Sequence, residues 1–201
     1  MRLIFIGAQA SGKGTQAKII SEKLGLKHIS TGDLLRSATG KLKEEIDSYI
    51  NEGNLVPDEL IFRLLKAKIV GLNGFILDGF PRNLEQAEML EKITKIDKII
   101  DIEISDATAI KRISGRRNCP KCGKIYNVYT NPKPKKENIC DDCGTKLFQR
   151  VDDTVEAAKK RLEIYHKETE PILKKYSSVK INGEMEIEEV TREIERKIKI
   201  Y

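Results

Sequence analysis

Apolar residues fall into two patterns that alternate along the chain. Short apolar runs, typical of buried strands, stand at residues 3–6, 28–29, 75–77, 99–104 and 179–181. Helical spacing of apolar residues covers residues 15–24, 30–35, 46–53, 57–67 and 186–200. Strands that alternate with helices predict a parallel sheet covered on both faces, an α/β fold. Ligands of such sheets bind beyond the carboxyl ends of the strands.

The segment at about residues 117–152 breaks this alternation. It shows little helical periodicity and holds all four cysteines of the chain. We therefore expect it to form an inserted lobe rather than a further strand–helix unit.

The first strand leads into a glycine-rich loop, in which residues 7–15 read G-A-Q-A-S-G-K-G-T. Gly7, Gly12 and Lys13 have the spacing of a phosphate-binding loop, whose backbone N–H groups and helix N-terminus face the anion. In the general pattern a Ser or Thr directly follows the lysine and binds magnesium. Here Gly14 takes that place and Thr15 follows. The loop predicts a nucleotide-phosphate site and leaves magnesium binding by its hydroxyl open.

Charge and composition narrow the class of protein. The chain has 37 basic and 31 acidic residues, a net charge of +6, and no apolar run of the roughly 20 residues that a membrane helix needs. Its lysines are scattered and not interleaved with aromatic residues, which favours an enzyme that handles phosphates over a nucleic-acid binder. The first residues lack the features of a signal peptide. We expect a cytoplasmic protein with neither membranes nor nucleic acids as partners.

The cysteines form two C-x-x-C pairs, each followed by glycine, with residues 123–139 between them. Cys119, Cys122, Cys140 and Cys143 have the spacing of a four-thiolate zinc site. Four protein ligands leave no open position for catalysis, so the metal is expected to be structural. Two disulfides or four free thiols are the alternatives, and iron could fill the same site.

Five further motifs follow in order along the chain. They are S-T-G-D-L-L-R at residues 30–36, L-V-P-D-E-L at 55–60, D-G-F-P-R at 78–82, G-R-R at 115–117 and R-V-D-D at 150–153. With G-K-G-T they resemble the adenylate kinase family, a branch of the nucleoside monophosphate kinases, and the match continues through Arg161, Tyr165, Thr169 and Pro171.

The resemblance implies a P-loop kinase fold with a five-stranded parallel sheet flanked by helices and two mobile lobes. The core would comprise residues 1–29, 57–115 and 154–201. Residues 30–56 would form the AMP-binding lobe, and residues 116–153 a zinc-binding lid over ATP.

The implied reaction is ATP + AMP = 2 ADP, reversible and dependent on magnesium, carried out by a monomer. Such a transfer depends on positioning two polyphosphates and cancelling their charge. The implied catalytic residues are Lys13, Asp78, Arg82, Arg116, Arg150 and Arg161. By the resemblance, Arg36 and Arg82 hold the AMP phosphate, and Arg150 and Arg161 bridge the substrates. Asp78 would position magnesium through water, with Asp33 assisting.

The resemblance also implies two sets of binding residues. Those for ATP are Ala10, Ser11, Gly12, Lys13, Gly14, Thr15, Arg112, Arg116, Ile125, Tyr126 and Met185. Those for AMP are Thr31, Arg36, Asn54, Leu55, Val56, Gly79, Phe80, Pro81, Arg82, Gln86, Arg150 and Arg161. For Tyr126, stacking near the ATP base and packing within the lid both remain open.

Three positions bear on the choice of acceptor. Thr31 and Gln86 match the adenylate type, in which the Gln86 amide could pair with the edge of adenine. Asn83, by contrast, is typical of UMP/CMP kinases. We expect AMP, with a UMP/CMP kinase or another nucleoside monophosphate kinase as the alternative. A zinc-ribbon P-loop ATPase that binds nucleic acid would leave D-G-F-P-R unexplained. His28 and His166 receive no role.

Overall fold

The computed structural model describes residues 1–51, 56–151 and 153–199, so Asn54 and Leu55 lie outside the described residues. Its core is one parallel sheet in the order β2-β3-β1-β4-β7. The strands are β1 (Arg2–Ile6), β2 (Lys27–Ser30), β3 (Phe75–Asp78), β4 (Lys98–Glu103) and β7 (Ser178–Asn182). Each coincides with a predicted apolar run, and the predicted five-stranded parallel sheet is confirmed.

Helices pack on both faces of this sheet, because alternate strand residues point to opposite sides. On one face Leu3 and Phe5 pack with the helices α1 (Lys13–Leu24) and α9 (Ile187–Ile198). On the other, Ile4 and Ile6 pack with α4 (Asp58–Ile69), α5 (Leu84–Glu91) and α8 (Glu170–Lys175). No helix in the described ranges is long and apolar enough to cross a membrane.

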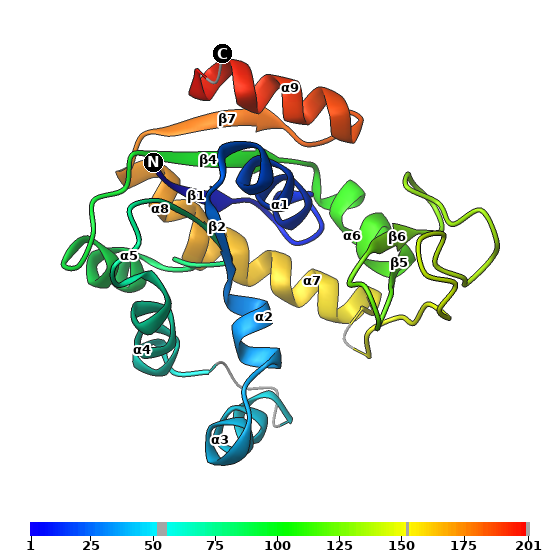
Figure 1. Cartoon of the computed structure of the whole chain (residues 1–201), viewed down its shortest axis with the longest axis horizontal. Coiled ribbons are helices and arrows are strands. Elements are labelled where there is room, and N and C mark those ends of the chain that lie inside the picture. Colours follow the sequence, from blue (N-terminus) through cyan, green and yellow to red (C-terminus); the bar gives the residue numbers. More distant parts are fainter. Residues whose placement is uncertain (52–55, 152, 200–201) are drawn as a thin grey trace.

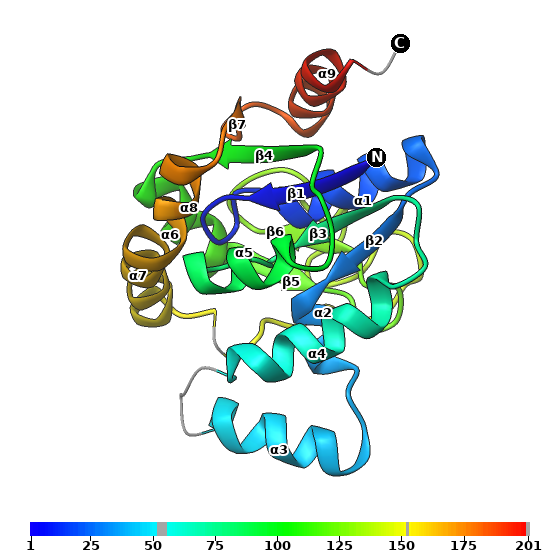
Figure 2. The same ribbon diagram turned by 90° about the vertical axis from the view of Figure 1, so that its left-hand side faces the viewer.

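Two lobes project from the core (Figure 1). After β2 the chain forms α2 (Thr31–Arg36) and α3 (Gly40–Asn51), and Figure 2 shows α3 beyond α4, away from the sheet. The second lobe lies between α6 (Asp106–Gly115) and α7 (Val155–Ile164) and contains the antiparallel pair β5 (Arg116–Asn118) and β6 (Ile125–Asn127). A small apolar cluster around Ile46 joins the first lobe to α4, and the second lobe has a cluster of its own around Tyr126.

Local signals set the ends of several helices. Ser30 caps α2 by accepting from the Asp33 N–H, and Gly25 ends α1 in the left-handed conformation at φ +63°. Between α7 and α8 the chain forms a π-helical turn, η1 (Tyr165–Thr169). This turn is not signalled by apolar spacing, and Thr169 Oγ1 donates from it to the Arg82 carbonyl at 2.7 Å.

Asp101 is an acid inside the core. It lies in β4, is 1% exposed, and its Oδ1 has no hydrogen-bond partner among the described residues. Burial raises the pKa of Asp101 to about 7, and the nearby Glu103 carboxylate acts in the same direction against the opposing charge of Lys180.

We predict that Asp101 makes the fold less stable as pH rises. Because its folded-state pKa lies above the unfolded value of 3.8, the folded state holds a proton that the unfolded state releases between those two values. The stability that this proton contributes is therefore fully present below about pH 4 and is lost progressively up to about pH 7. Asp101→Asn should raise the free energy of unfolding at pH 8 by on the order of 2–4 kcal/mol, and by much less at pH 5.

Urea unfolding at pH 5 and pH 8 measures this difference, with Glu163→Gln, a charge change on an exposed side chain, as the control. Equal effects of Asp101→Asn at both pH values would contradict the prediction.

Candidate active site

The sheet register brings the glycine-rich loop and Asp78 together. Asp78, the last residue of β3, pairs with Phe5 of β1 on one side and with Ser30 of β2 on the other. The loop at residues 7–15 follows β1 directly, so it starts at the same carboxyl edge of the sheet. This is the edge at which parallel sheets bind ligands.

The loop wraps tightly before α1 begins at Lys13. Gly12, the residue before the helix, has φ +97°, and Ala10 has φ +61°. Lys13 Nζ donates to the Ala8 carbonyl of the same loop at 3.2 Å. Burial lowers the pKa of Lys13; the Asp78 carboxylate opposes this shift, while Arg82 and Arg116 add to it. The predicted lysine thus stands in a cluster of charged side chains.

The structure explains why Gly14 replaces the usual hydroxyl residue. A Cβ atom added to Gly14 would lie 3.0 Å from Asp78 Oδ2, closer than side-chain atoms normally approach. With a larger residue after Lys13, the Asp78 carboxylate would have to move by a few tenths of an ångström. The departure from the general loop pattern therefore makes room for the acid at the end of β3.

The Asp78 carboxylate is also approached from β2. His28 Nε2 lies 3.6 Å from Asp78 Oδ2, and both side chains are largely buried. Burial acts to raise the pKa of Asp78, but the His28 imidazole and the charges of Lys13 and Arg82 outweigh it and hold the pKa below its usual value. His28 is a site residue that the sequence reasoning missed; the signal was the pairing of β2 with β3, on which His28 lies opposite Ile76.

Arg82 lies beside this acid, and arginines from two other segments lie near Arg82. Arg82 Nε donates to the Gly79 carbonyl at 2.9 Å. Burial lowers the pKa of Arg82, Asp78 opposes this, and the charges of Arg161 and Arg36 lower it further. Arg36 and Arg161 are thus each close enough to repel Arg82, an arrangement that a bound polyanion would relieve.

Asp33 differs from expectation. Its exposed carboxylate forms an ion pair with Arg36, with Asp33 Oδ1 2.5 Å from Arg36 Nη2. In this structure Asp33 therefore pairs with the AMP-lobe arginine that it precedes by one helical turn, and its assistance at magnesium stays a prediction.

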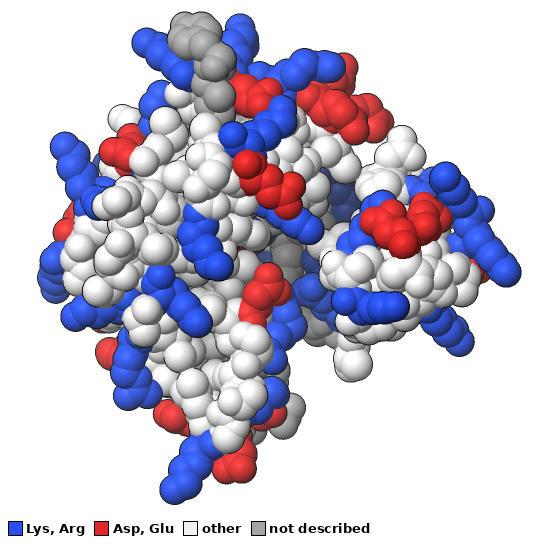
Figure 3. Space-filling model, viewed as in Figure 1, with Lys and Arg blue, Asp and Glu red and all other residues white. Residues whose placement is uncertain are grey.

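Two predicted arginines of the second lobe are held by polar partners. Arg116 makes a two-point contact with Asp153, in which Nε donates to Oδ2 at 2.8 Å and Nη2 donates to Oδ1, and the Asp153 side chain is fully buried. Arg150 Nη2 donates to Asn118 Oδ1 at 3.2 Å. Figure 3 shows basic side chains in the hollow between the core and this lobe. Asp153 was part of the R-V-D-D motif, but its role as a support for Arg116 emerged only from the fold.

Thr31 and Gln86, two of the residues predicted to bind AMP, are both buried, with 2% and 3% of their surface exposed. Thr31 Oγ1 donates to the Gly79 carbonyl at 2.7 Å. Gln86 is held at both ends of its amide, by the Arg82 N–H and by Asp58. Val56 is buried in the small core of this lobe. The sequence reasoning did not single out Asp58.

The remaining ATP positions are divided between exposed and buried side chains. Ile125 is 40% exposed and Tyr126 only 1%. The Tyr126 hydroxyl accepts from the Asp141 N–H at 2.9 Å, inside the lid cluster. Of the two interpretations left open by the sequence, the structure shows the Tyr126 side chain packed within the second lobe, and its contact with ATP stays a prediction. Arg112 Nη1 donates to the Gly183 carbonyl at 2.9 Å, and Met185 packs against the core beside it.

The four cysteine sulfurs meet at one point of the lid. All four Sγ atoms lie within 4.8 Å of one another, and the Cys119–Cys143 and Cys122–Cys140 pairs are 3.4 and 3.5 Å apart. These distances exceed the roughly 2.05 Å of a disulfide bond. They fit a tetrahedral zinc ion, whose sulfur ligands at about 2.3 Å stand roughly 3.8 Å apart. The donor set therefore suits a structural metal.

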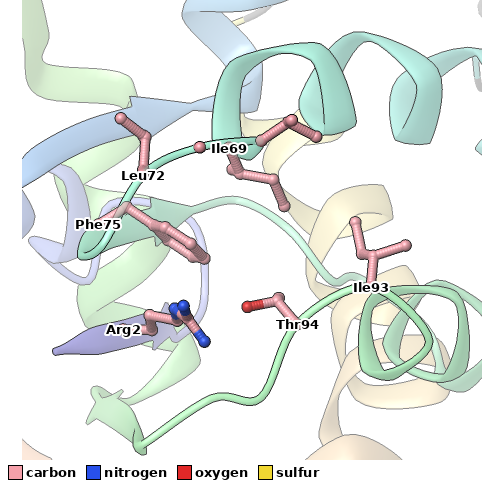
Figure 4. Close-up of a pocket in the computed structure, with 8 residues that line it drawn as sticks. Arg2, Ile69, Leu72, Phe75, Ile93 and Thr94 are labelled. Carbon is pink, nitrogen blue, oxygen red and sulfur yellow. The ribbon is translucent and has the colours of Figure 1, made fainter.

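A cavity of 230 Å³ lies at the opposite edge of the sheet (Figure 4). Arg2 and Phe75, the first residues of β1 and β3, line it together with Ile69, Leu72, Ile93 and Thr94. It is thus separated from Lys13 and Asp78 by the length of the strands, and it takes no part in the site described above.

The fold and this site define a class. They have the parts of a P-loop phosphotransferase: a parallel sheet, a phosphate loop ahead of α1, an acid at the end of the neighbouring strand, and arginines from two lobes.

The comparisons with known proteins name the family. A family model described as adenylate kinase matches residues 5–181. A protein named adenylate kinase from Caldicellulosiruptor saccharolyticus is 45% identical over 209 residues, covering 96% of this chain and 97% of its own. Proteins of the same name from Thermodesulfovibrio yellowstonii and Methanocella arvoryzae are 46% and 42% identical over 188 and 214 residues, covering 88% and 99% of this chain and 87% and 99% of their own. The chain belongs to the adenylate kinase family, an enzyme family of ATP:AMP phosphotransferases.

Gly14→Ala should separate stability from activity. Alanine favours the helix by up to about 1 kcal/mol over glycine, so the melting temperature should hold or rise. The new Cβ displaces the Asp78 carboxylate, so kcat should fall by roughly tenfold or more. Thermal melts and initial rates on one preparation measure both. A fully active Gly14→Ala enzyme would show that the close approach to Asp78 has no catalytic role.

Proposed function

We propose that this chain catalyses the reversible, magnesium-dependent transfer of a phosphoryl group from ATP to AMP, giving two ADP, and so balances the adenine nucleotides. The observation that supports this most is the cluster of charged side chains at the carboxyl edge of the sheet, in which Lys13 and Arg82 act on Asp78 while Arg36 and Arg161 act on Arg82. Family membership supports the same reaction.

The proposed catalysis rests on positioning and charge. The backbone N–H groups of residues 10–15 and Lys13 hold the ATP phosphates at the start of α1. Arg36 and Arg82 hold the AMP phosphate, and Arg116, Arg150 and Arg161 neutralise the group in transit. An AMP phosphate oxygen is already a nucleophile at neutral pH, so no side chain needs to act as a base.

Magnesium fits the site through Asp78. Its pKa lies below the usual value, so the carboxylate is available in ionised form beside the loop. Bound magnesium supplies charge neutralisation between the phosphates. Asp78 would hold magnesium through water, with Asp33 as the weaker candidate. Because Gly14 has no side chain, it leaves space beside the Asp78 carboxylate.

We further propose that residues 30–56 are the AMP-binding lobe and residues 116–153 a lid that closes over ATP, hinged on the core formed by residues 1–29, 57–115 and 154–201. Closure of both lobes excludes water, since a half-open site would hydrolyse ATP. The implied AMP contacts Asn54 and Leu55 belong to this proposal. The chain would act as a monomer in the cytoplasm, without nucleic acid or membrane as a partner; the cytoplasmic location agrees with the four cysteines forming no disulfide.

A panel of phosphoryl acceptors tests the reaction. With ATP as donor, AMP should give a kcat/KM at least about tenfold above those of UMP, CMP and IMP, because one wrongly paired polar group costs roughly 1–3 kcal/mol. A coupled assay for ADP measures all four. Faster turnover of UMP or CMP would assign the chain to the neighbouring kinase class instead.

Removal of zinc should lower the unfolding temperature of the lid but not that of the core. The four thiolates close the lid around one point, so a chelator should lower the temperature of a first unfolding step while the core transition stays in place. Calorimetry with and without chelator, with metal analysis on the same sample, makes the measurement. An unchanged unfolding profile from a sample shown to have lost its metal would rule out a structural ion.

A further inference from the structure

Asp58 joins two side chains of a different helix. It stands in the first turn of α4, where Asp58 Oδ2 accepts from Asn83 Nδ2 at 2.7 Å and Asp58 Oδ1 accepts from Gln86 Nε2 at 2.6 Å. The Gln86 Oε1 atom accepts from the Arg82 backbone N–H at 2.7 Å. Both ends of the buried Gln86 amide are therefore held by the protein itself.

These partners leave the amide only one orientation. An amide turned by 180° would point its NH₂ group at the Arg82 N–H and its oxygen at the Asp58 carboxylate. Donor would then face donor and acceptor would face acceptor, in a site that is 3% exposed. The carboxylate cannot adapt, because in its ionised form it only accepts hydrogen bonds.

We propose that Asp58 is a positioning residue that fixes the orientation of the Gln86 amide and thereby selects a 6-aminopurine over a 6-oxopurine as the phosphoryl acceptor. This inference rests on the proposed function and on the expectation that Gln86 reads the base. It identifies a residue that acts through Gln86 rather than by touching the substrate.

The chemistry of the two bases explains the selection. After its two protein contacts, the Gln86 amide keeps one N–H on Nε2 and one lone pair on Oε1. A 6-aminopurine offers a ring acceptor, N1, next to an amino donor, and pairs with this amide as it stands. A 6-oxopurine offers N1–H next to an oxygen, the reverse order, and needs the turned amide that Asp58 prevents.

A simpler explanation would make Asp58 only a favourable acid at a helix N-terminus. Its neighbour Glu59 provides a matched control, because it lies in the same first turn and is exposed. Glu59→Gln removes the same charge from the same helix end and leaves the Asp58–Gln86 contact in place.

The experiment measures kcat/KM for AMP and for IMP with ATP as donor, in the full chain carrying Asp58→Ala, Asp58→Asn or Glu59→Gln. In Asp58→Ala the AMP:IMP ratio should fall by roughly tenfold or more, as expected for loss of a hydrogen bond to a charged group. In Asp58→Asn it should fall less, though by more than about twofold, since the isosteric amide keeps one acceptor. The KM for ATP and the ratio in Glu59→Gln should stay at the wild-type value.

A double-mutant cycle adds a readout that a structural role would not move. In a Gln86→Leu background, Asp58→Ala should leave the AMP:IMP ratio unchanged, because the side chain through which Asp58 acts is gone. A further fall in that background would overturn the inference.

Equal losses for AMP and IMP in Asp58→Ala would show that Asp58 only supports the fold, and would also overturn it. If Asp58→Ala melts below the assay temperature, Asp58→Asn decides alone, and a ratio within about twofold of wild type rejects the proposal. Failure of the proposed function is distinguishable, because there the wild-type chain itself would not prefer AMP.

Discussion

The balance of charge around Asp78 is the interaction on which the rest of the site depends. Without cations nearby, burial would raise the pKa of a carboxylate in this position. Without the acid, burial would lower the pKa values of Lys13 and Arg82 further. The two cations lower the pKa of Asp78, and Asp78 opposes the lowering of their own pKa values by burial. That mutual support explains the glycine at position 14, since the loop must give way where the carboxylate stands.

Elsewhere in the structure, three further aspartates each hold a longer polar side chain. Asp153 holds Arg116 at two points in the lid, Asp33 holds Arg36, and Asp58 holds the Gln86 amide. A long or flexible side chain loses conformational entropy when it binds a substrate, and a partner that already orders it reduces that cost. The acids thus order, before any substrate binds, side chains that are proposed to contact the phosphates and the base.

Much of the fold could be predicted because its signals are local. The five apolar runs became the five strands, and Ser30 and Gly25 stand at helix ends as their chemistry indicates. The site was predictable where a motif held its own residues together, as around Lys13 and Arg82. The reasoning left open whether the Tyr126 ring packs inside its lobe, where the structure buries it, because one position in a motif does not reveal what packs on it. It also missed His28 and Asp58, whose partners lie 50 and 28 residues away in the chain.

By itself the sequence determined the alternation of strands and helices, the phosphate loop, the paired cysteines and the order of motifs that resemble the family. Each of these depends on spacing within one segment, which local backbone geometry converts directly into structure. Only the tertiary structure decided how closely Gly14 approaches Asp78, which acids pair with Arg36 and Arg116, and which way the Gln86 amide points. Those features depend on distances between segments that are far apart in the chain, and parallel strand pairing sets those distances only once the sheet has formed.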